Sequence, residues 1–217
     1  MISRSLAGLV VLGSMTLGGC VIHVGGGADG SDLSSVFGGV DVSEGRHVGD
    51  IATVNGGVTL EKRAQSGAID TVNGGVELGR YAMSQDIDVV NGNVDLDKHA
   101  MVVGDIETVN GDVTLTNDND VDGNIETLNG DIEITSGKVN GSIITHNGDI
   151  TLSDNTVVTG DIIFEERDKD SWGNSSAPTL TIDDSVTVSG RIILKREVRL
   201  KIDNPSLQDK VETDYRD

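Results

Sequence analysis

The sequence predicts an all-β protein, a single-stranded parallel β-solenoid of about nine coils with 18 or 19 residues each. Three observations support this fold class. An Asn-Gly corner recurs at that spacing, branched apolar and polar residues alternate after each corner, and the 217 residues include 29 glycines but only 2 prolines. A chain that winds into short stacked strands with tight turns between them would show all three features.

Each coil is expected to begin with an apolar residue, usually two positions after a glycine that permits a tight corner. In the coil that starts at Ile51, the alternation predicts that Val58 and Leu60 point into the core while Thr59 points to solvent. Connections between parallel strands are nearly always right-handed, which favours a right-handed coil. The nine predicted starts are Leu33, Ile51, Ile69, Ile87, Ile106, Ile125, Ile143, Ile162 and Ile192.

The asparagines of the corners are expected to form a column along the axis of the stack. Aligned amides in neighbouring coils can hydrogen-bond to one another, so we interpret this column as a structural ladder. Its members are Asn55, Asn73, Asn91, Asn110, Asn129 and Asn147.

The fourth residue of each opening strand is apolar, although the alternation should point it to solvent. Two interpretations are open. The chain bends at the corner and turns these side chains inward, or they form an exposed apolar stripe that pairs with another molecule. The column consists of Val54, Val72, Val90, Val109 and Leu128.

The eighth coil contains additional residues, which we interpret as an insertion loop at about 167–178 that leaves the body of the solenoid. Insertions in solenoids often lie on binding surfaces, so the single tryptophan of the chain, Trp172, is a candidate for contact with a partner. The alternative is that Trp172 folds back on the side of the coil.

The solenoid domain is expected to span residues 33–203. Charged pairs and unpaired strand edges predict how its C-terminal end is arranged. The register of the last coil places Glu165 beside Lys195, a favourable pair on neighbouring strands. Residues 204–217 are expected to form a tail or cap, because an uncovered solenoid end would expose an edge of unpaired strands.

Residues 1–19 have the layout of a secretory signal peptide, with Arg4, an apolar run and then small residues. The run ends in Leu-Gly-Gly-Cys, which resembles the lipobox of bacterial lipoproteins. The resemblance implies cleavage before Cys20 and attachment of lipid, with acyl chains such as palmitate, that anchors the protein in a membrane. Residues 20–32 are then the lipidated cysteine and a flexible Gly-rich linker. Because Val21 stands where an aspartate tends to retain lipoproteins in the inner membrane, the outer membrane is favoured in a Gram-negative cell.

The composition and the motifs give little support for catalysis or for nucleic-acid binding. A formal net charge of −20 argues against nucleic acid, because phosphate binding needs clustered lysines and arginines. No catalytic motif or ligand-spaced histidines are found, so we predict neither an enzyme nor a cofactor. Asp118, Asp120 and Asp122 precede a glycine as in an EF-hand calcium loop, but Asn129 stands where that loop needs glutamate. A solvated acidic face is therefore favoured over calcium binding.

The strand motif D-I-E-T-V-N-G-D-V-T-L, at residues 105–115, resembles a bacterial adhesin-like β-repeat family of unknown function. This resemblance covers about residues 33–202 and implies a surface or envelope solenoid with a structural, adhesion or scaffolding role. The corners at residues 157–163 and 186–193 also resemble bactofilins, which are polymer-forming cytoskeletal solenoids. That second resemblance implies the alternative function of a self-assembling filament subunit.

Overall fold

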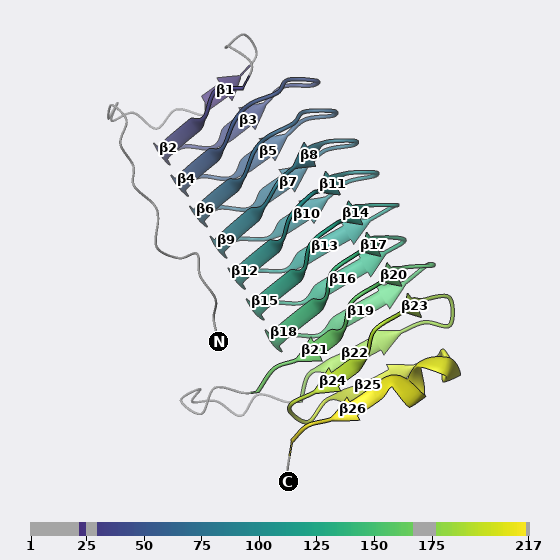
Figure 1. The fold of residues 1–217 in the computed structure, drawn as a ribbon. Coiled ribbons are helices and arrows are strands. Elements are labelled where there is room, and N and C mark those ends of the chain that lie inside the picture. Colours follow the sequence, from purple (N-terminus) through teal and green to yellow (C-terminus); the bar gives the residue numbers. More distant parts are fainter. Residues whose placement is uncertain (1–21, 25–29, 167–176, 216–217) are drawn as a thin grey trace.

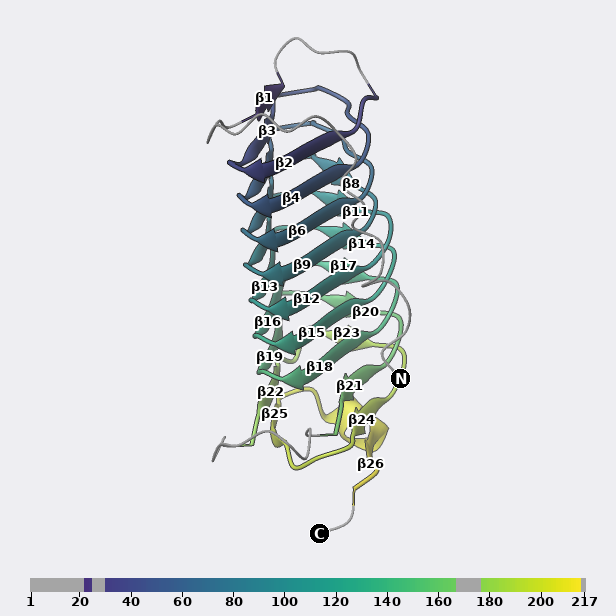
Figure 2. The ribbon, with the colours of Figure 1, turned by 90° about the vertical axis from the view of Figure 1, so that its left-hand side faces the viewer.

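In the computed structural model, which describes residues 22–24, 30–166 and 177–215, three parallel sheets wind into a solenoid of about nine turns (Figure 1). The strands of each sheet stack along one axis, from the N-terminal coils at one end to the C-terminal coils at the other (Figures 1 and 2). The predicted fold class is confirmed. The predicted right hand of the coil stays a prediction.

The coil starts predicted from the sequence are the first residues of nine strands in one sheet, here named sheet B. Its strands, in spatial order, are β2 (Leu33–Phe37), β4 (Ile51–Asn55), β6 (Ile69–Asn73), β9 (Ile87–Asn91), β12 (Ile106–Asn110), β15 (Ile125–Asn129), β18 (Ile143–Asn147), β21 (Ile162–Phe164), β24 (Ile192–Leu194) and β26 (Val211–Thr213). The strands pair in register, with Ile51 opposite Ile69 and Asn55 opposite Asn73. Each side chain therefore lies beside its counterpart in the next coil.

The apolar pairs that follow the Asn-Gly corner form a second sheet, sheet A. Its strands, in spatial order, are β1 (Ile22–Val24), β3 (Val40–Val42), β5 (Val58–Leu60), β7 (Val76–Leu78), β10 (Val94–Leu96), β13 (Val113–Thr116), β16 (Ile132–Thr135), β19 (Ile150–Ser153), β22 (Thr179–Ile182) and β25 (Arg199–Ile202). As the alternation predicts, Val58 and Leu60 are buried while Thr59 lies on the outer face.

A third side, sheet C, closes each coil and was not resolved by sequence reasoning. Its strands are β8 (Met83–Ser84), β11 (Met101–Val102), β14 (Asp120–Val121), β17 (Lys138–Val139), β20 (Val157–Val158) and β23 (Thr187–Val188). These strands have only two residues each, which is too short for a periodic pattern to identify. Among the described residues, the core enclosed by the three sheets contains aliphatic residues, a few threonines and serines, Phe164 and Asn119.

The glycines before the coil starts are needed for a different reason from the one expected. The backbone of Gly123 is not in the left-handed region, so its conformation does not require glycine. A Cβ atom at Gly123 would instead overlap the carbonyl group of Gly104 in the preceding coil. The same overlap occurs in the Asn-Gly corners, where a Cβ atom at Gly111 would meet the carbonyl oxygen of Gly92. At these two positions glycine therefore allows neighbouring coils to approach closely.

The fourth residues of the opening strands remain on the outer face of sheet B. Val54, Val72 and Val90 are half-buried, since each lies against its counterpart in the next coil. Of the two interpretations, the inward bend does not occur. The column is a partly covered apolar stripe beside the outward second positions of the same strands.

Both ends of the solenoid differ from the expected pattern. Residues Ile22–Val24, within the segment expected to be a flexible linker, form β1 and pair with β3. At the other end, the expected tail or cap contains the 3-10 helix η1 (Pro205–Lys210) and β26. Leu207 of η1 is buried in the core, and the Lys210 ammonium donates to the carbonyl oxygen of Ser189 at 3.0 Å. Strand β26 is an additional coil start, found at the usual spacing after Ile192.

The register around the insertion is as expected, although the loop itself lies largely outside the described residues. The Lys195 ammonium contacts the two carboxylate oxygens of Glu165 at 2.8 and 3.0 Å, which confirms the predicted pair. Strand β21 is followed by β22, which stacks on β19 as a normal coil would. The insertion therefore leaves the stack undisturbed.

Candidate functional site

The corner asparagines form an unbroken hydrogen-bond ladder on the surface of the solenoid. Each amide nitrogen donates to the amide oxygen one coil earlier, from Asn73 to Asn55 and onward to Asn147, at 3.0 or 3.1 Å. Most of these side chains are exposed at the corner between sheets B and A. Arg196 continues the ladder past Asn147, donating to its amide oxygen at 3.0 Å and to the backbone oxygen of His146 at 2.7 Å. The amides are thus engaged within the chain.

A shorter ladder of threonines runs beneath the asparagines, and sequence reasoning missed it. Buried Thr53 donates to the Gly56 carbonyl at 2.6 Å and lies 2.8 Å from the hydroxyl of Thr71. Thr108 and Thr127 repeat this arrangement with Gly111. These inward hydroxyls hold the Asn-Gly corners, so they have a structural role.

The structure does not assemble the calcium candidate. Asp120 lies on the extended strand β14, with Asp118 and Asp122 before and after it, so the chain does not wrap around a central point as an EF-hand loop does. A carboxylate oxygen of Asp118 accepts a hydrogen bond from Ser136 at 2.7 Å, and one of Asp122 accepts from Asn140 at 2.6 Å. Among the described residues, no group of three or more His, Cys, Asp and Glu side chains converges as a metal site.

Two other residues singled out in the sequence lie outside the described residues. These are Cys20, the expected lipid attachment site, and Trp172, the expected contact residue of the insertion. In the part of the chain that the structure describes, no helix is long and apolar enough to cross a membrane.

A column of carboxylates runs along the outer face of sheet B, at the second position of successive strands. In-register pairing places Asp88 between Asp70 and Glu107, with Glu126 next. We call these four residues the acidic column. Partial burial, together with repulsion from Asp70 and other nearby carboxylates, raises the pKa of Asp88 from 3.8 to about 6.

The neighbours of Asp88 in the acidic column show the same effect. Asp70 and Glu107 are exposed overall, but desolvation of their carboxyl groups and repulsion by nearby carboxylates raise their pKa values as well. The acidic column therefore carries like charges closer together than they would lie in the unfolded chain.

The turns between sheets A and C carry a second charged surface, which holds cations together with the carboxylates Glu44, Glu61 and Asp97. Four of the six lysines and arginines in residues 30–166 lie here. The guanidinium carbon of Arg63 lies 5.7 Å from the centre of the Tyr81 ring, and that ring stacks on His99 with centroids 4.9 Å apart. We call this surface the cation–aromatic corner; it comprises Lys62, Arg63, Arg80, Tyr81, Lys98 and His99.

Left-handed backbone conformations produce the stack of the cation–aromatic corner. Arg63, Tyr81 and His99 have φ values of 60°, 59° and 58°, where the preceding coil has Gly45 at 69°. A bulky residue in this region costs roughly 1 kcal/mol or more. Backbone bonds between coils hold the turns, for example from the Tyr81 amide to the Lys98 carbonyl at 3.2 Å. The sequence carried a signal, since these three residues recur every 18 positions.

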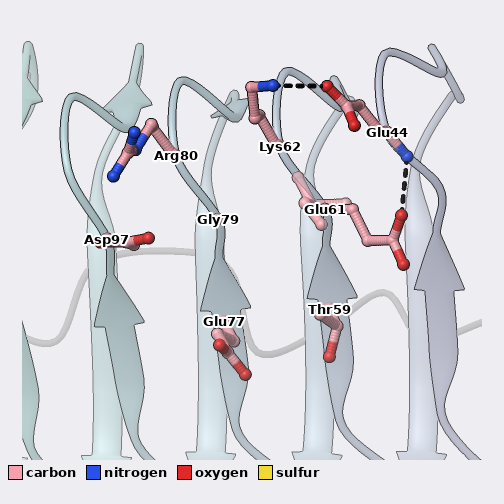
Figure 3. Close-up of a pocket in the computed structure, with 9 residues that line it drawn as sticks. Glu44, Thr59, Glu61, Lys62, Glu77, Gly79, Arg80 and Asp97 are labelled. Atoms are coloured by element: carbon pink, nitrogen blue, oxygen red, sulfur yellow. Dashed lines mark hydrogen bonds and ion pairs between the residues drawn. The ribbon is translucent and has the colours of Figure 1, made fainter.

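Beside the cation–aromatic corner lies an open depression of about 430 Å³ (Figure 3). Acidic and basic side chains both line it. Gly79, which has no side chain, occupies the position between Glu61 and Asp97. Lys62 forms an ion pair with Glu44 at 2.8 Å, whereas Arg80 and Lys98 have no side-chain partner among the described residues. This arrangement provides cationic donors and an exposed tyrosine, and arginine and tyrosine are enriched at protein interfaces.

Comparison of the chain with protein-family models, with curated proteins and with solved structures finds no match. The geometry of the described residues is therefore the basis for the functional proposals below.

The asparagine ladder should contribute to stability in proportion to the bonds that each member makes. Asn110→Ala removes a donated and an accepted ladder bond and should lower the free energy of unfolding by about 1 kcal/mol. Asn55→Ala, at the end of the ladder, removes one ladder bond and a longer bond, 3.3 Å, donated to the Val36 carbonyl, and should cost somewhat less. Urea unfolding would measure both. Equal stability of both variants and the parent would show that the ladder contributes nothing.

The acidic column should make the protein more stable as the pH falls from about 7 to 4. The folded state takes up a proton at Asp88 near pH 6, whereas the unfolded state does so near pH 4. The ionised Asp88 therefore destabilises the folded state at high pH, and this destabilisation disappears once Asp88 is protonated. Asp88→Asn should raise the free energy of unfolding at pH 8 by about 1 kcal/mol, allowing for partial exposure, and have no effect at pH 4. Asp95→Asn, on the outer face of sheet A, is the matched control. A gain that persists at pH 4 would contradict this explanation.

Proposed function

We propose that this protein is a non-enzymatic, lipid-anchored β-solenoid of the cell envelope that serves as a scaffold and presents a binding surface. The observation that carries the proposal is that some polar side chains bond within the stack while others face solvent. The asparagine amides and the hydroxyls of Thr53 and Thr108 are engaged within the stack, while at the cation–aromatic corner Arg80 and Tyr81 are exposed and Lys98 is half-buried. A rigid rod with one exposed recognition surface suits adhesion or scaffolding.

The position of β1 supports a close attachment to the membrane. Strand β1 begins at Ile22, two residues after the expected lipid site at Cys20, and it is paired to the first coil. An acyl chain contributes about 0.8 kcal/mol per buried methylene group, so a multiply acylated cysteine holds its protein firmly. On this proposal the N-terminal coil lies next to the lipid surface and the C-terminal coil extends away from it.

The anchor is tested by labelling cells that express the full chain with radioactive palmitate. The parent protein should incorporate label and pellet with membranes, whereas Cys20→Ser should do neither, because the acylated sulfur is lost. Ser14→Ala, within the expected signal peptide, is a control that should keep the label. An unlabelled parent protein that remains in the soluble fraction would overturn the anchor.

Open strand edges favour a second candidate function, the end-to-end filament. Strands β25 and β26 end their sheets, with no further partner among the described residues. Against it, η1 occupies the place of a sheet C strand at that end, and Arg199 and Lys201 lie on the edge strand, which is typical of edges protected from pairing. Electron microscopy of residues 21–217 at high concentration distinguishes the candidates. We expect separate rods, and filaments one solenoid wide would favour end-to-end assembly.

A further inference from the structure

Cations that are unpaired among the described residues and a column of carboxylates occupy opposite sides of the solenoid. The cation–aromatic corner joins sheet A to sheet C, since its turns follow β5, β7 and β10 and lead toward sheet C. The acidic column lies on the outer face of sheet B, which is the third side of the coil. Arg80 and Lys98, at a vertex that also holds Glu61 and Asp97, are therefore complementary in charge to the carboxylates on the opposite side.

The two surfaces also share the same stretch of the axis and the same repeat. Arg80 lies in the chain between Asp70 and Asp88, and Lys98 lies between Asp88 and Glu107. Both arrays repeat once per coil, at about 4.8 Å. Two parallel solenoids at the same height would place each cation of one beside the carboxylates of the other.

Each surface has an unmet electrostatic requirement within a single chain. The side chains of Arg80 and Lys98 have no partner among the residues that the structure describes. The carboxylates of the acidic column lie in register in neighbouring strands and repel one another; burial and this repulsion together raise the pKa of Asp88. An incoming cation would relieve that repulsion, so the pairing gains from both sides.

Apolar contacts fit the same pairing. Tyr81 is 47% exposed at the cation–aromatic corner, and exposed tyrosine and arginine are the residue types that dominate binding at protein interfaces. Beside the acidic column runs the half-buried stripe that includes Val72, Val90 and Val109. The stripe offers an apolar surface for the tyrosine next to the carboxylates.

We propose that the partner of the cation–aromatic corner is the sheet B face of a second copy of this chain, with the two solenoids side by side and parallel. The contact is heterologous, because different surfaces of the two copies meet. Since the surfaces lie on opposite sides of the coil, each copy can bind one neighbour through its corner and another through its face. The product is a straight row of solenoids.

Membrane attachment would favour such rows, and in this respect the inference rests on the proposed function. Anchoring at the N-terminal end sets all copies at one height and raises their local concentration. The net charge of −20 opposes approach, but at physiological salt charges are screened beyond about 8 Å, so the local pairs decide the contact.

The experiment uses the full acylated chain in phosphatidylcholine vesicles and a carbodiimide that joins amines directly to carboxylates. Isotope-labelled and unlabelled chains are mixed, so that only links between copies are counted. We expect links from Lys98 to Asp88 or Glu107, and about a tenfold loss of linked dimer in Arg80→Glu/Lys98→Glu, because several ion pairs act together. The matched control, Lys138→Glu/Lys201→Glu, makes the same change in net charge away from the corner and should keep the links.

A mixture of two variants with exchanged charges provides the decisive test. Asp88→Lys/Glu107→Lys should also fail to pair alone, whereas its mixture with Arg80→Glu/Lys98→Glu should restore links between labelled and unlabelled chains. Circular dichroism confirms that each variant is folded. The proposal would be overturned if each variant on its own formed as much linked dimer as the parent, or if the links mapped to other residues. It would also be overturned if mixing the two variants did not restore the linked dimer. Flotation of the vesicles reports on the anchor separately, and the same cross-linking in concentrated solution tests the pairing without it.

Discussion

Parallel stacking in register is the constraint on which the rest of this structure depends. Each side chain lies about 4.8 Å from its counterpart in the next coil, so its nearest neighbours are the residues at the same position of the adjacent coils. A side-chain amide both donates and accepts, so it can form hydrogen bonds in both directions along such a column. Asn91 donates to Asn73 and accepts from Asn110. A carboxylate cannot, because Asp70 and Asp88 are both acceptors with the same charge.

The same rule explains the less regular features of the molecule. A guanidinium, a phenol and an imidazole at one turn position stack as flat groups, which gives the contact of Arg63, Tyr81 and His99. The backbone bonds between coils maintain the left-handed turns that these residues adopt. Where the column pattern stops, at the C-terminal end, other groups complete it: Arg196 extends the asparagine ladder and Leu207 fills the core.

A chain built in this way has its functional potential on its sides. The core residues and the inner ladders stabilise a rod. The outer columns differ in charge from one side to another, which can direct how the rod meets a neighbouring molecule. The proposals therefore concern surfaces and attachment, in agreement with the strongly acidic composition.

The sequence by itself determined the coil length, the starts of nine coils, the alternation of sheets A and B, and the pair of Glu165 with Lys195. These follow from periods of 18 or 19 and of 2 residues, which hydrophobic burial imposes directly on sequence. Only the tertiary structure placed the column of Val54 on the outer face, stacked Tyr81 on His99, and set the cation–aromatic corner opposite the acidic column. Those features depend on where the chain turns and how many sides a coil has, and two-residue strands such as β8 leave no periodic signal of that geometry.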